Sequence, residues 1–179
     1  LARIGQASIS SLAEASEEAA KVSAVWQSAL DTALQAFRWG FNTKRATLAL
    51  AEQNPVGYSY EYKYALPTGF LQAYSVYNAE STESADYIIE DGFLFTNCPC
   101  AMLAYAVRTE NTTLFSATFI DALAWRLAGD LAICLTQRSD IAKQAEAQYQ
   151  QAISTARSLA GNNRKVDVRG RTRYITARS

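Results

Sequence analysis

Apolar residues return every three or four positions along three stretches of the chain. This spacing places them on one face of an α-helix, with polar residues on the opposite face. The first stretch is preceded by Ser16, a good helix cap, and begins with Glu17 and Glu18, which favour a helix N-terminus. Gly161 follows the third stretch as a stop signal. The pattern predicts helices at about 14–38, 114–135 and 139–160.

Between the first two helices the period changes to two, which is typical of β-strands. Tyrosines alternate with polar residues over 58–64, and apolar runs cover 70–77 and 102–108. Glu90-Asp91-Gly92 separates two short apolar runs, at 87–89 and 93–95, as a hairpin turn would. Residues 43–50 either pair with these strands or extend the exit from the first helix. We therefore expect a strand-rich insertion at about 43–109.

The elements together indicate an α+β fold that is mainly α. We expect a helical bundle with a small antiparallel β-sheet insertion and an extended C-terminal arm. The domain is expected to cover 1–160, and the arm 161–179. With 179 residues, 49% of them hydrophobic, the chain is long enough to bury a core. Apolar runs stay well short of the roughly 18 residues of a membrane span, and no signal peptide is visible after Leu1.

The sequence contains no histidine, which narrows the chemistry open to it. Ser-His-Asp and Cys-His catalysis are excluded, as is any zinc site that uses imidazole. The eight glycines form no phosphate-binding loop. Cys98, Cys100 and Cys134 indicate a reducing compartment and are expected to be structural free thiols, because a zinc site needs about four ligands. We expect a protein that is not an enzyme and has no cofactor or metal.

Two further groups of residues have both a functional and a structural interpretation. Asp86, Glu90 and Asp91 would suit a carboxylate metal site, but a charged hairpin tip is the favoured interpretation. The alternating tyrosines of residues 58–64 would suit stacking on bases or sugars, but a buried or interfacial aromatic face is favoured. Trp26, Phe37, Phe119, Leu123 and Leu127 are expected to share one helical core.

Charge is distributed unevenly, although the 17 basic and 17 acidic residues balance. Residues 1–160 hold 11 basic and 16 acidic side chains, a net charge of −5, whereas residues 161–179 hold six basic and one acidic, a net charge of +5. Such basic segments are often interaction tails. We expect an interaction arm whose contact residues are Arg164, Lys165, Arg169, Arg171, Arg173, Tyr174, Ile175 and Arg178.

Several segments, taken in order, resemble one known family. The segment at 37–48, Phe-Arg-Trp-Gly-Phe-Asn-Thr-Lys-Arg-Ala-Thr-Leu, resembles the W-N-F-A-x-K-R-A-x-L stretch of the tail tubular protein A family. Residues 60–67 resemble its Y-x-Y-x-L-P, 87–95 its hairpin, and 105–108 its Y-x-x-R. Residues 114–128 resemble its L-F-x-x-x-F-x-x-A-L-A-x-R-L-A. Gly40 stands where the family usually has Asn, and neither Cys98-Pro99-Cys100 nor the arm has a family counterpart.

The resemblance implies a structural role in a phage virion. Members of this family are head-to-tail adaptors of short-tailed phages. They form a ring, commonly of twelve copies, beneath the portal protein at the capsid vertex. The ring is the docking platform for the tail nozzle and lines the channel through which double-stranded DNA leaves. The implied partners are therefore other copies of the chain, the portal, the nozzle and passing DNA, with no membrane. We expect the arm to bind the portal.

Two alternatives from other classes stay open. A nucleic-acid-binding module would use the basic arm and the tyrosine face, and its binding would depend strongly on salt. A metal-dependent enzyme would use Asp86, Glu90 or Asp91 and would bind divalent cations tightly.

Overall fold

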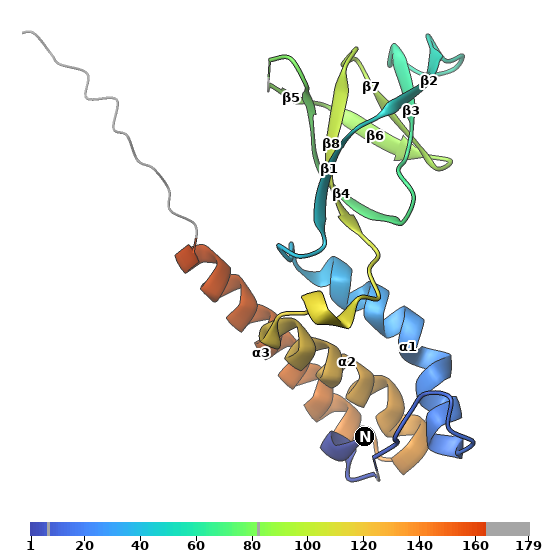
Figure 1. Ribbon diagram of the computed structural model, residues 1–179, viewed down its shortest axis with the longest axis vertical. Helices are drawn as coiled ribbons and strands as arrows, with labels where there is room; N and C mark the ends of the chain where they lie inside the picture. Colours follow the sequence, from blue (N-terminus) through green and yellow to red (C-terminus); the bar gives the residue numbers. More distant parts are fainter. Residues whose placement is uncertain (7, 82, 164–179) are drawn as a thin grey trace, which may run out of the picture.

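The computed structural model describes residues 1–6, 8–81 and 83–163. Within these residues the chain forms a helical layer and a separate sheet lobe, stacked along the long axis (Figure 1). The sheet lobe is inserted between α1 and α2, so the chain leaves the helical layer after α1 and returns before α2. No helix of the described part has the length and apolar character that crossing a membrane requires.

The helical layer consists of α1 (Glu17–Ala36), α2 (Ala117–Thr136) and α3 (Ser139–Asn163). Serine side chains cap the first two helices: Ser16 accepts a hydrogen bond from the Ala19 backbone N–H at 3.2 Å, and Ser116 does the same for Phe119 at 3.3 Å. Short 3-10 turns, η1 (Ala2–Ile4) and η2 (Thr112–Leu114), precede α1 and α2. The third helix continues through Gly161, because one glycine costs a helix only about 1 kcal/mol.

The sheet lobe contains two four-stranded antiparallel sheets, with strand orders β1-β8-β4-β5 and β2-β3-β7-β6. Leu48 joins β1 to β2, so one extended segment contributes an edge strand to each sheet. The strands are β1 (Thr43–Thr47), β2 (Ala49–Gln53), β3 (Tyr62–Ala65), β4 (Phe70–Asn78), β5 (Ser84–Ala85), β6 (Tyr87–Glu90), β7 (Phe93–Thr96) and β8 (Ala101–Val107).

Each part of the molecule has its own core. Side chains from both sheets, among them Tyr64, Leu94 and Leu103, form one cluster inside the sheet lobe. The helical layer has a large cluster at the end that faces the sheet lobe and a smaller one around Ile4 and Leu131 at the opposite end. The five residues that were predicted to share a core meet at the large cluster: Phe119 and Leu123 are buried in it, and the other three, Trp26, Phe37 and Leu127, are partly buried and pack against it.

The predicted fold class, a mainly helical bundle with a small sheet insertion, is wrong. The structure is 43% helical and 25% strand, an α+β fold with two antiparallel sheets. The physical reason is that the strands pack on one another around their own apolar cluster, so the sheets do not need the helices to cover them. The extended arm expected after residue 160 begins with helix, and residues 164–179 lie outside the described residues.

Candidate functional site

The predicted arm residues cannot be placed in this structure. Arg164, Lys165, Arg169, Arg171, Arg173, Tyr174, Ile175 and Arg178 all lie outside the described residues. The candidate functional surfaces are therefore those of the helical layer, the sheet lobe and the segment that joins them.

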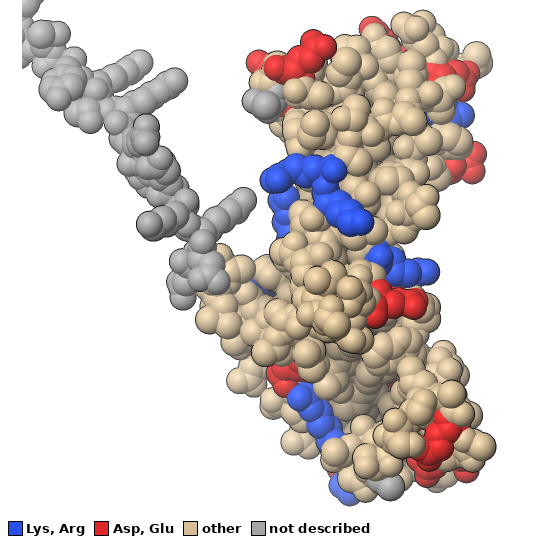
Figure 2. Space-filling view, in the orientation of Figure 1, with Lys and Arg blue, Asp and Glu red and all other residues tan. Residues whose placement is uncertain are grey.

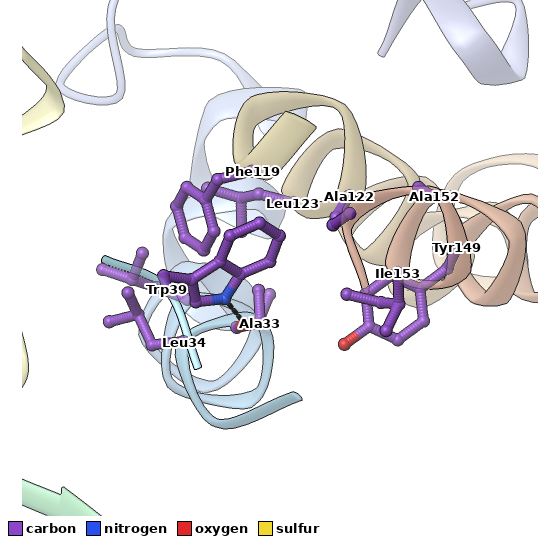
Figure 3. Close-up of a cluster of buried hydrophobic side chains, with 12 residues drawn as sticks. Ala33, Leu34, Trp39, Phe119, Ala122, Leu123, Tyr149, Ala152 and Ile153 are labelled. Carbon is purple, nitrogen blue, oxygen red and sulfur yellow. Dashed lines mark hydrogen bonds between the residues drawn. The ribbon is translucent and has the colours of Figure 1, made fainter. Parts of the chain in front are cut away.

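The segment that leaves α1 for the sheet lobe is held by an aromatic cluster, which we call the joint: Phe37, Trp39 and Phe41 with Phe115 and Phe119. The Trp39 ring lies 5.1 Å from that of Phe119, edge to face, and the Phe41 ring lies 5.5 Å from that of Phe115. Trp39 is buried, and its indole N–H donates to the Ala33 carbonyl at 2.9 Å (Figure 3). The joint therefore fixes both crossings of the chain against the same helices.

Asn42 links the joint to the start of the sheet lobe. Its side chain is fully buried, and its Nδ2 donates to the Leu34 carbonyl at 3.2 Å. Its backbone carbonyl accepts from the Val107 N–H at 2.9 Å, which brings the two ends of the sheet lobe together. Sequence reasoning did not single out Asn42, although a polar residue inside an aromatic run was a signal that could have done so.

An ion pair crosses from the sheet lobe to α1 beside the joint. The Arg108 guanidinium donates to both carboxylate oxygens of Asp31, with Nε to Oδ1 at 2.8 Å. The Arg108 backbone N–H also donates to the Gly69 carbonyl at 2.8 Å. A bidentate pair fixes orientation as well as distance. Nothing in the sequence indicates this pair, because Asp31 and Arg108 lie 77 positions apart.

Basic side chains gather where the sheet lobe meets the helical layer (Figure 2). Arg38, Lys44 and Arg45 are exposed there, and residues 32–51 contain no acidic side chain. The Arg38 guanidinium lies over the Tyr74 ring, 4.8 Å from its centre. This arrangement gives the molecule a positively charged patch, which we call the basic waist, at the junction of its two parts.

The sheet lobe between β1 and β8 is acidic. Residues 50–100 contain a single basic side chain, Lys63, and seven exposed carboxylates: Glu52, Glu61, Glu80, Glu83, Asp86, Glu90 and Asp91. Lys63 pairs with Glu52, Nζ to Oε2 at 3.4 Å. Asp86, Glu90 and Asp91 lie at the two ends of β6, and in the described residues they make no ion pair with a cation. The described residues contain no group of three or more His, Cys, Asp or Glu placed to hold a metal ion.

The alternating tyrosines of residues 58–64 do not form one face. The strand expected over residues 58–64 begins only at Tyr62. Tyr58 lies before it and stacks on Phe95 at 3.9 Å between ring centres. Tyr64 is buried, and its hydroxyl donates to the carbonyls of Cys98 and Pro99, both at 2.8 Å. Desolvation raises the pKa of Tyr64 above its ordinary value. Tyr64 therefore anchors the Cys98-Pro99-Cys100 turn.

The cysteines are free thiols in three settings: Cys98 is buried, Cys100 is half-buried and Cys134 is exposed. The Cys100 thiol contacts the Glu80 carboxylate at 3.8 Å. A polar pocket of about 270 Å³ lies next to this turn, lined in part by Asp86, Asn97 and Cys98.

A charged cluster lies between α2 and α3. Arg126 binds Asp130 at 2.9 Å and approaches Glu146 at 3.8 Å. Burial raises the pKa of Asp130, because desolvation of its carboxylate outweighs the attraction of Arg126. The Tyr149 hydroxyl is buried on the same side of α3 and has no hydrogen-bond partner among the described residues, and burial raises its pKa as well.

The N-terminal segment packs on α2 and leaves a pocket of about 380 Å³, lined by Leu1, Ile9 and Leu127 among others. Arg3 lies over the Trp125 ring at 4.2 Å and binds the Asp121 carboxylate at 2.6 Å. These contacts hold the segment on the helical layer.

A scan of the chain against protein-family models gives no match, and a search of curated proteins finds no relative.

Proposed function

We propose that this chain is a structural protein of a phage virion, a head-to-tail adaptor that forms a ring under the portal. The proposal rests first on the ordered resemblance of the sequence to the tail tubular protein A family. Its copies would form a ring of about twelve, receive the tail nozzle and line the channel for double-stranded DNA.

The observation that carries the proposal is where the resembling segments lie. The stretch at 37–48 and the stretch at 114–128 are far apart in the sequence, yet Trp39 and Phe41 of the first contact Phe119 of the second at the joint. Arg108, from the Y-x-x-R segment, binds α1 beside them. Segments of one shared architecture are expected to meet in the fold, as these do. Their meeting supports the view that they belong to one shared architecture.

The joint also suits the task of a ring subunit. A ring closes only when each copy meets the next at a fixed rotation, so the two parts of a subunit must keep a defined relation. The buried rings and the Asp31–Arg108 pair supply that rigidity. The acidic surface of the sheet lobe suits a DNA channel, because repulsion between like charges prevents the protein from holding the DNA.

Electron microscopy of the chain mixed with portal rings of a short-tailed phage tests this proposal. We expect an additional ring of density stacked on one end of the portal, absent from samples of either component alone. Portal rings that stay bare at saturating concentrations of a folded chain would contradict it.

A nucleic-acid-binding module is the second candidate, and the basic waist favours it. Arg38, Lys44 and Arg45 are exposed cations, and the sequence of the arm contains six more basic residues. Such a module would bind duplex DNA with an affinity that falls steeply as salt rises. Replacing Lys44 and Arg45 by Gln would reduce both the affinity and its salt dependence, whereas an adaptor of the proposed kind would bind DNA weakly with or without these two cations.

A further inference from the structure

We propose that the C-terminal arm of one copy pairs as an added strand with the free edge of β6 in a second copy. That the arm reaches a second copy rests on the proposed ring. That it pairs with this edge rests on the backbone geometry and charge of β6 and on the sequence of the arm.

The β6 strand offers an open edge. It is the outermost strand of its sheet and pairs only with β7. Asp91 and Gly92 form the two-residue turn, and both have positive φ, 48° and 75°, as a type I′ turn requires. The flanking pair, Glu90 and Phe93, therefore exchanges backbone hydrogen bonds, and Ile88 does so two residues on. The backbone groups of Tyr87 and Ile89 consequently point away from β7, towards the open edge.

The side chains of β6 alternate between an apolar inner face and an outer face that carries negative charge. Tyr87 and Ile89 pack against the core of the sheet lobe, which leaves Asp86, Ile88 and Glu90 on the outer face. Asp86 and Glu90 are exposed carboxylates, and Asp91 adds a third at the turn. An incoming strand would meet two unpaired backbone positions and a row of negative charge.

The sequence of the arm matches this edge. Arg169, Arg171 and Arg173 alternate with Val168, Gly170, Thr172 and Tyr174. In an extended strand the three guanidinium groups share one face, and arginine forms bidentate pairs with carboxylates. The other face carries apolar or small side chains, which suit the side of the sheet on which Tyr87 and Ile89 pack. Strand addition of this kind draws affinity from main-chain hydrogen bonds and specificity from alternate side chains.

The other three edges fit the arm less well. β1 carries Lys44 and Arg45, which would repel it, and β5 has only two residues. The single carboxylate of β2, Glu52, is already paired with Lys63. β6 is therefore the sheet edge of the described structure with unpaired negative charge and enough length to receive a strand.

The arm is long enough to reach a neighbouring copy. It follows the end of α3, and an extended chain covers about 3.3 Å per residue, so residues 164–179 span up to roughly 53 Å. From the sequence we expected the arm to bind the portal. The acidic edge provides a partner within the chain itself, and an arm-to-edge contact is heterologous, as a closed ring requires.

Photo-crosslinking of the full-length protein tests this pairing. A benzophenone amino acid is placed at Ile88, and the same probe at Leu50 on the β2 edge is the matched control. Equal amounts of ¹⁵N-labelled and unlabelled protein are mixed at high concentration, with and without portal rings. We expect mixed-isotope adducts between residue 88 and a peptide of the arm, and none from residue 50. Adducts confined to one chain, or no adduct between residue 88 and the arm with or without portal rings, would overturn the proposal.

Charge exchange provides a second measurement. Asp86→Lys with Glu90→Lys in one chain, and Arg169→Glu with Arg171→Glu and Arg173→Glu in another, should each abolish the adduct. Mixing the two variants should restore it, because the reversed arm of one then meets the reversed edge of the other, and the unaltered arm meets the unaltered edge. No restoration in folded variants would show that the contact is not between these surfaces. If portal rings stay bare but the adducts form, the ring proposal fails and the pairing stands; if rings form without adducts, the pairing fails and the ring proposal stands.

Discussion

Phe119 is the residue on which the joint depends most. Its side chain is fully buried and contacts the rings of Trp39, Phe41 and Phe115. Phe119→Ala removes these contacts and leaves a cavity, so it should lower the free energy of unfolding by about 3–5 kcal/mol. Urea denaturation followed by circular dichroism measures this loss. Ile120→Ala is the control, because Ile120 is the next residue of α2 and is 52% exposed. Equal stability of the two variants would contradict the assignment of the helix faces.

Asp130 should make stability depend on pH in the acidic range. Burial raises the pKa of Asp130 in the folded chain above its ordinary value of 3.8. A carboxyl with a raised pKa favours folding most below its unfolded pKa, and this contribution is lost as pH rises through the folded pKa. Relative to the wild type, Asp130→Asn should therefore gain stability as the pH rises from below 4 towards neutral. Thermal melts of both proteins across that range measure the difference, and parallel curves would contradict it.

At the scale of elements, the β6–β7 hairpin depends on one glycine. Gly92 has φ of 75°, which an alanine adopts only with strain. Gly92→Ala should destabilise the protein by about 1 kcal/mol. Gly40→Ala is the matched control, because Gly40 has no positive φ and an added Cβ there meets nothing within 4 Å. Denaturation midpoints of the two variants give the comparison, and a neutral Gly92→Ala would show that the turn relaxes freely.

The elements that the sequence predicted well are those with a local cause. Helical stripes such as Val22, Leu30 and Leu34 depend on spacing within a single element, and the Asp91-Gly92 turn depends on two residues. The strand at Tyr58 was misplaced because alternation does not show which strand will be its partner, and Tyr58 instead stacks on Phe95. The two-residue strand β5 is too short to have any pattern. The joint is built from long-range contacts, and the position of β6 at a sheet edge depends on the order of the strands, neither of which a single sequence displays.

The molecule as a whole should be a monomer or a small oligomer before it meets the portal. In a heterologous contact two different surfaces meet, so an open row of subunits keeps one unpaired contact surface at each end. Short rows are therefore less stable per subunit than a closed ring. Analytical ultracentrifugation at micromolar concentration should give a mass near one copy, 19.6 kDa, or a few copies. A stable compact dimer whose mass is indifferent to portal rings would contradict the proposed mode of assembly. The variant with reversed arm charges provides the comparison, because it should show no self-association.

The meeting of Asn42 and Val107 has a consequence for the order of folding. Ala36 and Ala117 are about 80 residues apart, and closing a flexible loop of that length costs about 4 kcal/mol of chain entropy. Once the sheet lobe has formed, its ends lie together, and only about 15 flexible residues remain, for which the cost is about 2.4 kcal/mol. The sheets should therefore fold early and hold the end of α1 close to the start of α2, so that the two helices pack in a later step. Trp26, Trp39 and Trp125 all lie outside the sheets, so their fluorescence would report the later step, and Gly92→Ala, although remote from every tryptophan, would delay it.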